Sequence, residues 1–218
     1  YFAPLTGRCS NFWYNSRVSN EKDPHLYHGT KQQNLTELSP SEAGHKDKYV
    51  YAVSNKAYAL IFINRPGGSL VAKWGEDSKG NPYYVEKVEG ILKRNYANVK
   101  GSIYTVDKKL FFKNKKLHSI EYISKKTVPV IKEIEIDDLE EYFIKLCNEG
   151  NINIIYYKDR LKVFPNIDKN IVKSALKLID KYGKDAILPD IQKYHPYILD
   201  EILDQTSSNI VQWAEQNS

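Results

Sequence analysis

The feature that most constrains the fold is a change in the spacing of apolar residues close to position 137. Up to Ile136, short apolar and aromatic runs alternate with turns rich in Gly, Asp and Ser, which is typical of β-strands. From Asp137 onward, apolar residues recur every three or four positions, as on one face of a helix. The sequence therefore predicts an α+β chain, with a β-rich domain over residues 1–136 and a helical C-terminal extension over 137–218.

The same patterns place the individual elements. In the first domain, strand-like segments occur at 48–53, 70–74, 83–90, 102–106, 117–123 and 128–136. A helix is expected to open after Ser54 or Asn55, because both residue types are favourable N-caps. Later helices are expected at 139–149, 168–182 and 189–203, the last one interrupted around His195. Residues 151–157 fit either a strand or a helix start. We expect the late helices to complete or flank the core, and a separate substrate-recognition unit is the alternative.

The composition is that of an ordinary soluble globular protein, with 41% hydrophobic and 27% charged residues in a chain of 218. No stretch approaches the roughly 20 apolar residues of a membrane span, so we expect a cytoplasmic protein with no membrane partner. The histidines lack metal-ligand spacing and the two cysteines lie far apart, so no metal is expected. Glu86 and Glu89 are expected on opposite faces of a strand, as solvent-facing charges.

Three short motifs contain the candidate site residues. The first closes the apolar run Leu26-Tyr27, the second lies in the segment 48–53 and the helix after it, and the third interrupts the strand pattern at 117–123. An acid in an otherwise apolar strand either faces solvent or has a function. The residues concerned are His28, Gly29 and Thr30, then Tyr51 and Tyr58, and finally Glu121.

The order of these motifs resembles the ADP-ribosyltransferase superfamily, in both the poly(ADP-ribose) polymerase branch and the small rifampicin-inactivating enzymes. Residues 26–30 are similar to a motif whose histidine holds the adenosine ribose and whose glycine backbone holds the nicotinamide carboxamide. Tyr51 matches the tyrosine that stacks on nicotinamide. Lys56-Ala57-Tyr58 is similar to the lysine, small residue and second aromatic that follow, with alanine in place of serine. Glu121 matches the catalytic glutamate of the polymerases.

The resemblance implies a split β-sheet core that binds NAD as a substrate. His28, Gly29, Thr30, Tyr51 and Tyr58 would be its binding residues, and His28, Tyr51 and Glu121 its catalytic residues. The rifampicin-type enzymes instead carry an aspartate soon after a strand similar to 101–106, which here points to Asp107. Of the two acids we favour Glu121.

The chemistry of NAD cleavage explains these residue types. Breaking the bond between nicotinamide and ribose gives an oxocarbenium-like sugar, which a fixed carboxylate such as Glu121 stabilises. Aromatic rings, here Tyr51 and Tyr58, position the departing nicotinamide and exclude water. Gly29 lets backbone groups approach the carboxamide because it has no Cβ. The expected activity is transfer of ADP-ribose to an unknown protein, nucleic-acid or small-molecule acceptor. NAD hydrolysis and RNA 2′-phosphotransfer are related alternatives on the same fold.

Positive charge is concentrated between Lys100 and Lys126. Eight lysines and two acids give this segment a net charge of +6, whereas the whole chain carries +5. Such a segment attracts the pyrophosphate of NAD or a nucleic acid. A solvated hairpin, with turns at Asp107-Lys108 and Asn114-Lys115, explains the same charges. The alternative to an enzyme is therefore a catalytically silent nucleic-acid-binding or interaction module that uses this segment.

Overall fold

A computed structural model describes residues 23–42, 47–114 and 120–206. The chain is a mixed α+β protein whose residues form two compact units that alternate along the sequence. The sheet unit comprises the described residues of Tyr1–Arg65, Gly75–Tyr83 and Leu92–Ile154, and the helical unit those of Pro66–Trp74, Tyr84–Ile91 and Ile155–Ser218. This grouping differs from a division at residue 137, because the helix after that point belongs to the sheet unit.

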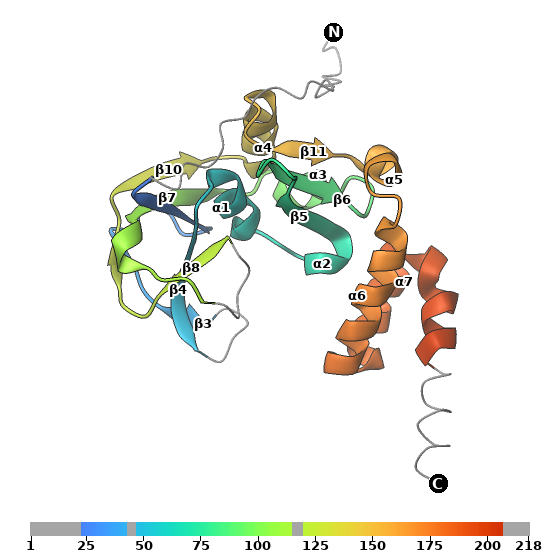
Figure 1. Cartoon of the computed structure of the whole chain (residues 1–218). Coiled ribbons are helices and arrows are strands. Elements are labelled where there is room, and N and C mark those ends of the chain that lie inside the picture. The colour runs from blue at the N-terminus through green and yellow to red at the C-terminus, as the bar shows by residue number, and fades with distance from the viewer. Residues whose placement is uncertain (1–22, 43–46, 115–119, 207–218) are drawn as a thin grey trace. The chain divides into compact units, whose positions relative to one another are not determined.

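The sheet unit is built around a six-stranded antiparallel sheet in the order β10-β7-β1-β4-β3, with β8 also paired to β4 (Figure 1). Its strands are β1 (His25–Thr30), β3 (Ser41–Glu42), β4 (Lys48–Val53), β7 (Gly101–Asp107), β8 (Glu121–Ser124) and β10 (Lys132–Ile136). The strands predicted at 48–53 and 102–106 are confirmed. The beginning of the strand predicted at 117–123 lies outside the described residues.

This sheet is divided along its middle. Six residue pairs join β1 to β7 and four join β4 to β8. Among the described residues, a single pair, Tyr27 with Val53, joins β1 to β4. The strands β10-β7-β1 and β8-β4-β3 therefore form two groups that separate beyond that pair.

Helix α1 (Lys56–Ile63) packs against β1, β4 and β7. Asn55 is its N-cap, since the Asn55 side chain accepts the Ala57 N–H at 2.8 Å. Six of its eight residues are buried. The helix approaches β1 so closely that a Cβ built on Gly29 would lie 1.9 Å from the Ala59 carbonyl oxygen. Glycine at position 29 is therefore what allows helix and strand to pack.

Two further helices and a short strand pair complete the sheet unit: α3 (Ile91–Tyr96), α4 (Leu139–Asn148), and β2 (Glu37–Leu38) paired with β9 (Val128–Pro129). The ring of Tyr96 packs on that of Phe143 with 4.8 Å between centroids, which joins α3 to α4. The helix predicted at 139–149 is confirmed, because Asp138 caps it by accepting the Glu141 N–H at 3.0 Å.

Several expected strands end or begin elsewhere. Residues 70 and 71 lie in the short helix α2 (Gly68–Val71), because Gly67 and Gly68 turn the chain with φ values of 77° and 52°. The strands β5 (Ala72–Glu76) and β6 (Pro82–Glu86) follow, and the prediction of a strand up to residue 90 is wrong. The strand expected over 128–136 is broken because β9 pairs with β2 whereas β10 pairs with β7.

The expectation of a solvent-facing Glu86 is also wrong. Glu86 is 3% exposed, and its carboxylate accepts the backbone N–H of Tyr157 at 3.2 Å. Glu89 lies in the turn after β6 and is exposed. The uncertain segment 151–157 contains a strand, β11 (Asn153–Ile155), in a three-stranded sheet of order β11-β6-β5. The division between the two units passes through the residues of these three strands.

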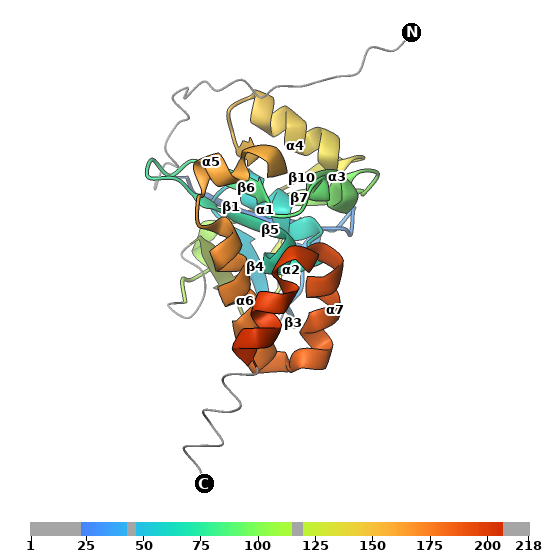
Figure 2. The same cartoon turned by 90° about the vertical axis from the view of Figure 1, so that its right-hand side faces the viewer.

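The helical unit consists mainly of α6 and α7, which lie against each other and both contact α2 (Figure 2). Helix α6 spans Ile167–Tyr182 and α7 spans Lys184–Tyr194. The unit also contains α5 (Arg160–Val163), a helix over 199–206, and the one-turn helices η2 (Tyr157–Asp159) and η3 (Pro196–Ile198). The helix predicted at 168–182 is confirmed. The one predicted over 189–203 is divided at His195, as the sequence indicates, although it begins already at residue 184. In the described part of the chain, no helix has the length and apolarity to span a membrane.

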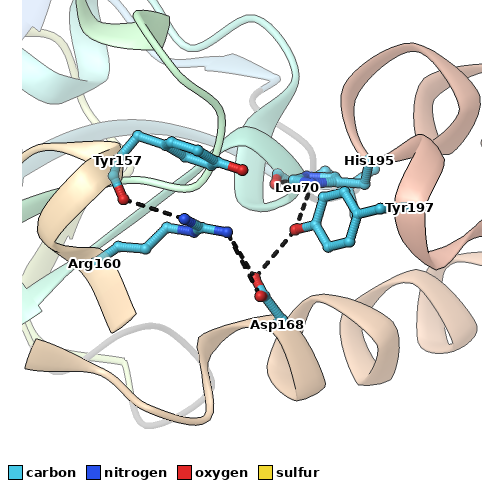
Figure 3. A network of polar contacts seen from close by, with 6 residues as sticks. All are labelled: Leu70, Tyr157, Arg160, Asp168, His195 and Tyr197. Carbon is cyan, nitrogen blue, oxygen red and sulfur yellow. Dashed lines mark hydrogen bonds and ion pairs between the residues drawn. The ribbon is translucent and has the colours of Figure 1, made fainter. Parts of the chain in front are cut away.

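A buried polar network connects the elements of this unit (Figure 3). His195 has no exposed surface, and its Nε2–H donates to the Leu70 carbonyl oxygen at 2.7 Å. The Tyr197 hydroxyl donates to the Asp168 carboxylate at 3.1 Å. These contacts tie η3 to α2 and α6.

Arg160, the first residue of α5, also belongs to this network. Its side chain is 8% exposed and donates to Asp168 at 3.4 Å and to the Tyr157 carbonyl oxygen at 3.1 Å (Figure 3). The guanidinium carbon also lies 3.6 Å from the centroid of the Tyr157 ring. Because a buried guanidinium is costly without partners, the contact with Asp168 offsets part of the cost of burying Arg160.

Burial makes the stability of the helical unit depend on pH. Burial lowers the pKa of His195, and the charges of Lys87 and Arg160 lower it further, against the Leu70 hydrogen bond and Asp168. Since the folded pKa lies below the unfolded value of about 6.5, the neutral ring stabilises the fold fully above that pH, and this stability is lost as the pH falls toward the folded pKa. We expect the free energy of unfolding in urea to fall between about pH 7 and pH 5, by about 1.4 kcal/mol per unit of pKa depression.

The matched variant is His195→Gln, which keeps a donor for Leu70 but does not titrate in this range. It is expected to be less stable than the wild type at neutral pH and to show a shallower decline toward acid. Parallel pH profiles for the two proteins would contradict this role of His195.

Candidate functional site

A cavity of about 760 Å³ lies in the sheet unit, beside the single residue pair that joins β1 to β4. This volume is in the range of about 300–1,000 Å³ that is usual for small-molecule sites. The wall is formed by β1, β4, the segment 32–41, the end of α1 and the first residue of β8. The structure thus brings together five of the six residues singled out in the sequence: His28, Gly29, Thr30, Tyr51 and Glu121.

His28 is held as a neutral ring in a defined tautomer. Its Nδ1 lies 2.6 Å from the Tyr51 carbonyl oxygen. A carbonyl oxygen only accepts hydrogen bonds, so Nδ1 carries the proton and Nε2 is left as an acceptor. Burial lowers the pKa of His28, against the opposing effect of the Tyr51 carbonyl, so the ring is neutral at pH 7. A neutral imidazole with Nε2 as acceptor suits a ligand hydroxyl better than an anionic group.

Tyr51 and Glu121 lie on one face of two paired strands. In the β4–β8 ladder Val53 is opposite Glu121 and Tyr51 is opposite Ile123, so Tyr51 and Glu121 are diagonal neighbours. Burial raises the pKa of Tyr51, and the negative charge of Glu121 raises it further. The register of this ladder therefore places a carboxylate beside an aromatic ring in the cavity wall.

Tyr58 does not lie at this cavity, which corrects the expectation that it forms the second side of an aromatic sandwich. The Tyr58 side chain has no exposed surface and lies near Glu76 and Tyr83, away from the residues that line the cavity. Phe62, one helical turn later in α1, lines the cavity instead. The helix turns Tyr58 into the core of the sheet unit, and this could not be read from a motif of three residues.

The structure also shows where Asp107, the alternative acid, and Thr30, an expected NAD-binding residue, lie. Asp107 is opposite His25, at the end of β7, and does not line the cavity. Its carboxylate accepts the Lys109 N–H at 2.9 Å and so caps the one-turn helix η1 (Lys108–Leu110). This favours Glu121 over Asp107 as the acid of the site. Thr30 lines the cavity, and its hydroxyl accepts the Gln32 N–H at 3.3 Å.

Sequence reasoning missed several residues of the wall. Tyr27, Tyr49, Phe62 and Arg65 all line the cavity. Tyr49 was detectable, since it is two residues from Tyr51 in a strand and therefore on the same face. The Tyr49 and Tyr51 rings pack edge to face with 5.9 Å between centroids. Arg65 follows the end of α1 and belongs to no recognisable motif.

A carboxylate outside the cavity holds one of its walls. Glu133 on β10 accepts hydrogen bonds from the Asn34 N–H at 3.0 Å and from the Tyr104 hydroxyl at 2.8 Å. The same hydroxyl oxygen accepts the Leu35 N–H at 3.1 Å. Asn34 and Leu35 both line the cavity. The segment that closes this side is thus fixed to the sheet by side chains, because it has few strand partners of its own.

The basic segment surrounds a tyrosine on the other side of β8. Lys108 and Lys113 lie over the Tyr122 ring, 5.6 Å and 4.9 Å from its centroid. Tyr122 follows Glu121 in the strand, so their side chains point to opposite faces. Phe112 pairs with Ile123 in an antiparallel bridge. Lys115, Lys116 and the turn expected at Asn114-Lys115 lie wholly or partly outside the described residues.

Comparison of the chain with protein-family models, with curated proteins and with solved structures finds no match. Over residues 23–42, 47–114 and 120–206, no group of three or more His, Cys, Asp or Glu side chains is arranged to hold a metal ion. The chemistry of the site must therefore be argued from the cavity itself.

Proposed function

We propose that the protein is an ADP-ribosyltransferase that binds NAD in this cavity, cleaves the bond between nicotinamide and ribose, and passes ADP-ribose to an acceptor. The observation that carries the proposal is the convergence of His28, Tyr51 and Glu121, far apart in the sequence, on one cavity. The divided antiparallel sheet supports it as well, because a split sheet is what the resemblance to this superfamily implies.

In the proposed reaction, the bond between ribose C1′ and the nicotinamide nitrogen breaks, and its electron pair leaves with nicotinamide. The ribose acquires positive charge, which the fixed carboxylate of Glu121 stabilises most strongly in the transition state. Tyr51 and Phe62 offer aromatic surface to the departing ring and limit access of water. The acceptor nucleophile then bonds to C1′ and loses its proton. Water in the same place gives NAD hydrolysis.

The test is to incubate the purified chain with NAD and follow nicotinamide release by chromatography. His28→Ala is expected to lower kcat/KM about tenfold, because the ligand hydroxyl loses its acceptor. His25→Ala is the matched control, since His25 lies in the same strand but pairs with Asp23 and does not line the cavity. Absence of nicotinamide release would overturn the proposal, and calorimetry with NAD then shows whether the cavity still binds the dinucleotide.

The second candidate is a nucleic-acid-binding module that uses the basic segment. It is favoured by the lysines that flank Tyr122 and by Phe112, which is 47% exposed beside Lys113. Cations interleaved with aromatic rings suit single-stranded nucleic acid. Salt-sensitive binding of an oligonucleotide by a protein that does not bind NAD would favour this function.

A further inference from the structure

We infer that Arg65 binds the phosphate group of the ligand, so that the cavity takes a phosphorylated nucleotide in preference to the corresponding nucleoside. The nature of the ligand as an ADP-ribose compound rests on the proposed function. Arg65 lies outside all the motifs that suggested that function, and its position is an independent feature of the cavity.

The part of the cavity wall that the structure describes contains two acids and one cation. Among the described residues that line the cavity, Glu37 and Glu121 are the acids and Arg65 is the only lysine or arginine. His28 is neutral at pH 7, as its lowered pKa requires. Without a cation, these carboxylates would repel an anionic ligand at close range. Arg65 is therefore the group on which binding of a phosphorylated ligand depends.

The guanidinium of Arg65 packs on the ring of Phe62. Its central carbon lies 4.4 Å from the centroid of the Phe62 ring, one turn earlier in the chain. A guanidinium that packs on an aromatic ring is restricted in its rotamers, and its planar fork of donors matches the geometry of phosphate oxygens. Because the stacking limits its rotamers, less conformational entropy is lost on binding.

The backbone around Arg65 is also constrained. The Asn64 side chain donates a hydrogen bond to the Asn95 carbonyl oxygen, which fixes the chain where α1 ends. Proline follows Arg65 in the sequence and restricts the preceding residue to extended conformations. The chain thus leaves the helix in one direction, and Arg65 remains exposed at the cavity wall.

Arg65 and the proposed catalytic acid, Glu121, line the same cavity. Partial burial of the guanidinium lowers the pKa of Arg65, and the charges of Tyr96 and Glu121 oppose this effect. In a nucleotide the phosphate is bonded to the ribose through its 5′ carbon. If Glu121 faces the ribose hydroxyls, the phosphate bonded to that ribose lies toward Arg65.

The experiment is a calorimetric titration of the full chain with ADP-ribose, and separately with adenosine and with nicotinamide, which carry no phosphate. Arg65→Gln is expected to weaken ADP-ribose binding by about tenfold to a hundredfold, the range for charge-assisted hydrogen bonds, and to leave nicotinamide binding unchanged. Arg65→Lys keeps the charge but loses the planar fork, so it should fall between the two. Arg94→Gln, an exposed arginine outside the cavity, is the matched control.

The outcomes separate this inference from the proposed function. If Arg65→Gln weakens ADP-ribose binding but the wild type releases no nicotinamide from NAD, the phosphate-binding role stands and the transferase proposal fails. If Arg65→Gln binds ADP-ribose as tightly as the wild type, with the same salt dependence, the inference is overturned and the transferase is untouched. If the wild-type chain does not bind ADP-ribose, the inference is overturned, and nicotinamide release from NAD decides the transferase proposal separately.

Discussion

Glu121→Gln is expected to lower the rate of nicotinamide release from NAD by about a hundredfold or more while leaving NAD affinity nearly unchanged. The amide has the shape of the carboxylate but no charge, so it removes the interaction that grows as the ribose becomes positive. The measurement is kcat and KM from nicotinamide release, with calorimetry as the measure of affinity. The ladder position of Glu121 beside Tyr51 suggests that the substitution disturbs no core packing.

Glu135→Gln provides the matched control, because Glu135 is an exposed strand glutamate on β10 that does not line the cavity. Its rates should equal those of the wild type. An equal loss in both variants would point to a general effect of charge. A Glu121→Gln protein with wild-type kcat would remove Glu121 from the mechanism.

Gly29→Ala is expected to cause the largest loss of stability among single methyl additions in the sheet unit. The new Cβ would lie 1.9 Å from the Ala59 carbonyl oxygen and 2.9 Å from the Ile63 side chain, so α1 must move away from β1. Overpacking of a core usually costs about 1–3 kcal/mol, and a clash with backbone belongs at or above the upper end of that range. Urea denaturation followed by circular dichroism measures the change in the free energy of unfolding.

Gly80→Ala is the comparison for this substitution. A Cβ there meets nothing within 4 Å, although φ is +79°, so only backbone strain of about 1–2 kcal/mol is expected. If the two variants lose the same stability, contact with α1 is not the reason for glycine at position 29. The effect also assigns Gly29 a packing role in addition to the carboxamide contact expected from the resemblance.

Local patterns predicted the elements that depend on local physics. The strand at 48–53, the Asn55 cap and the helix after Asp138 are all determined by residues within a few positions. His28 and Glu121 were also identified, because one ends and the other interrupts an apolar run, whereas Tyr51 was identified only from the resemblance to the superfamily. Their meeting in one cavity depends on strand order, which a single sequence does not reveal.

The wrong predictions have one cause in common: contacts with distant parts of the chain decide where these side chains lie. Tyr58 was expected beside Tyr51, but the rotation of α1 against the sheet turns Tyr58 inward, which only packing determines. Glu86 was expected in solvent, but a backbone N–H from residue 157 reaches it from much later in the chain. Arg65 carried no signal at all, since a single arginine before a proline is common in loops.

The single pair between Tyr27 and Val53 has a consequence for how this site tolerates mutation. Past that pair, β1 and β4 share no further ladder pair among the described residues, and residues of both strands line the cavity. Main-chain N–H and C=O groups without a ladder partner can bond a ligand amide, and all residue types except proline have both groups. If the proposed carboxamide contact is made there, substitutions that keep the backbone path of the two strands, unlike Gly29→Ala, should leave that contact in place.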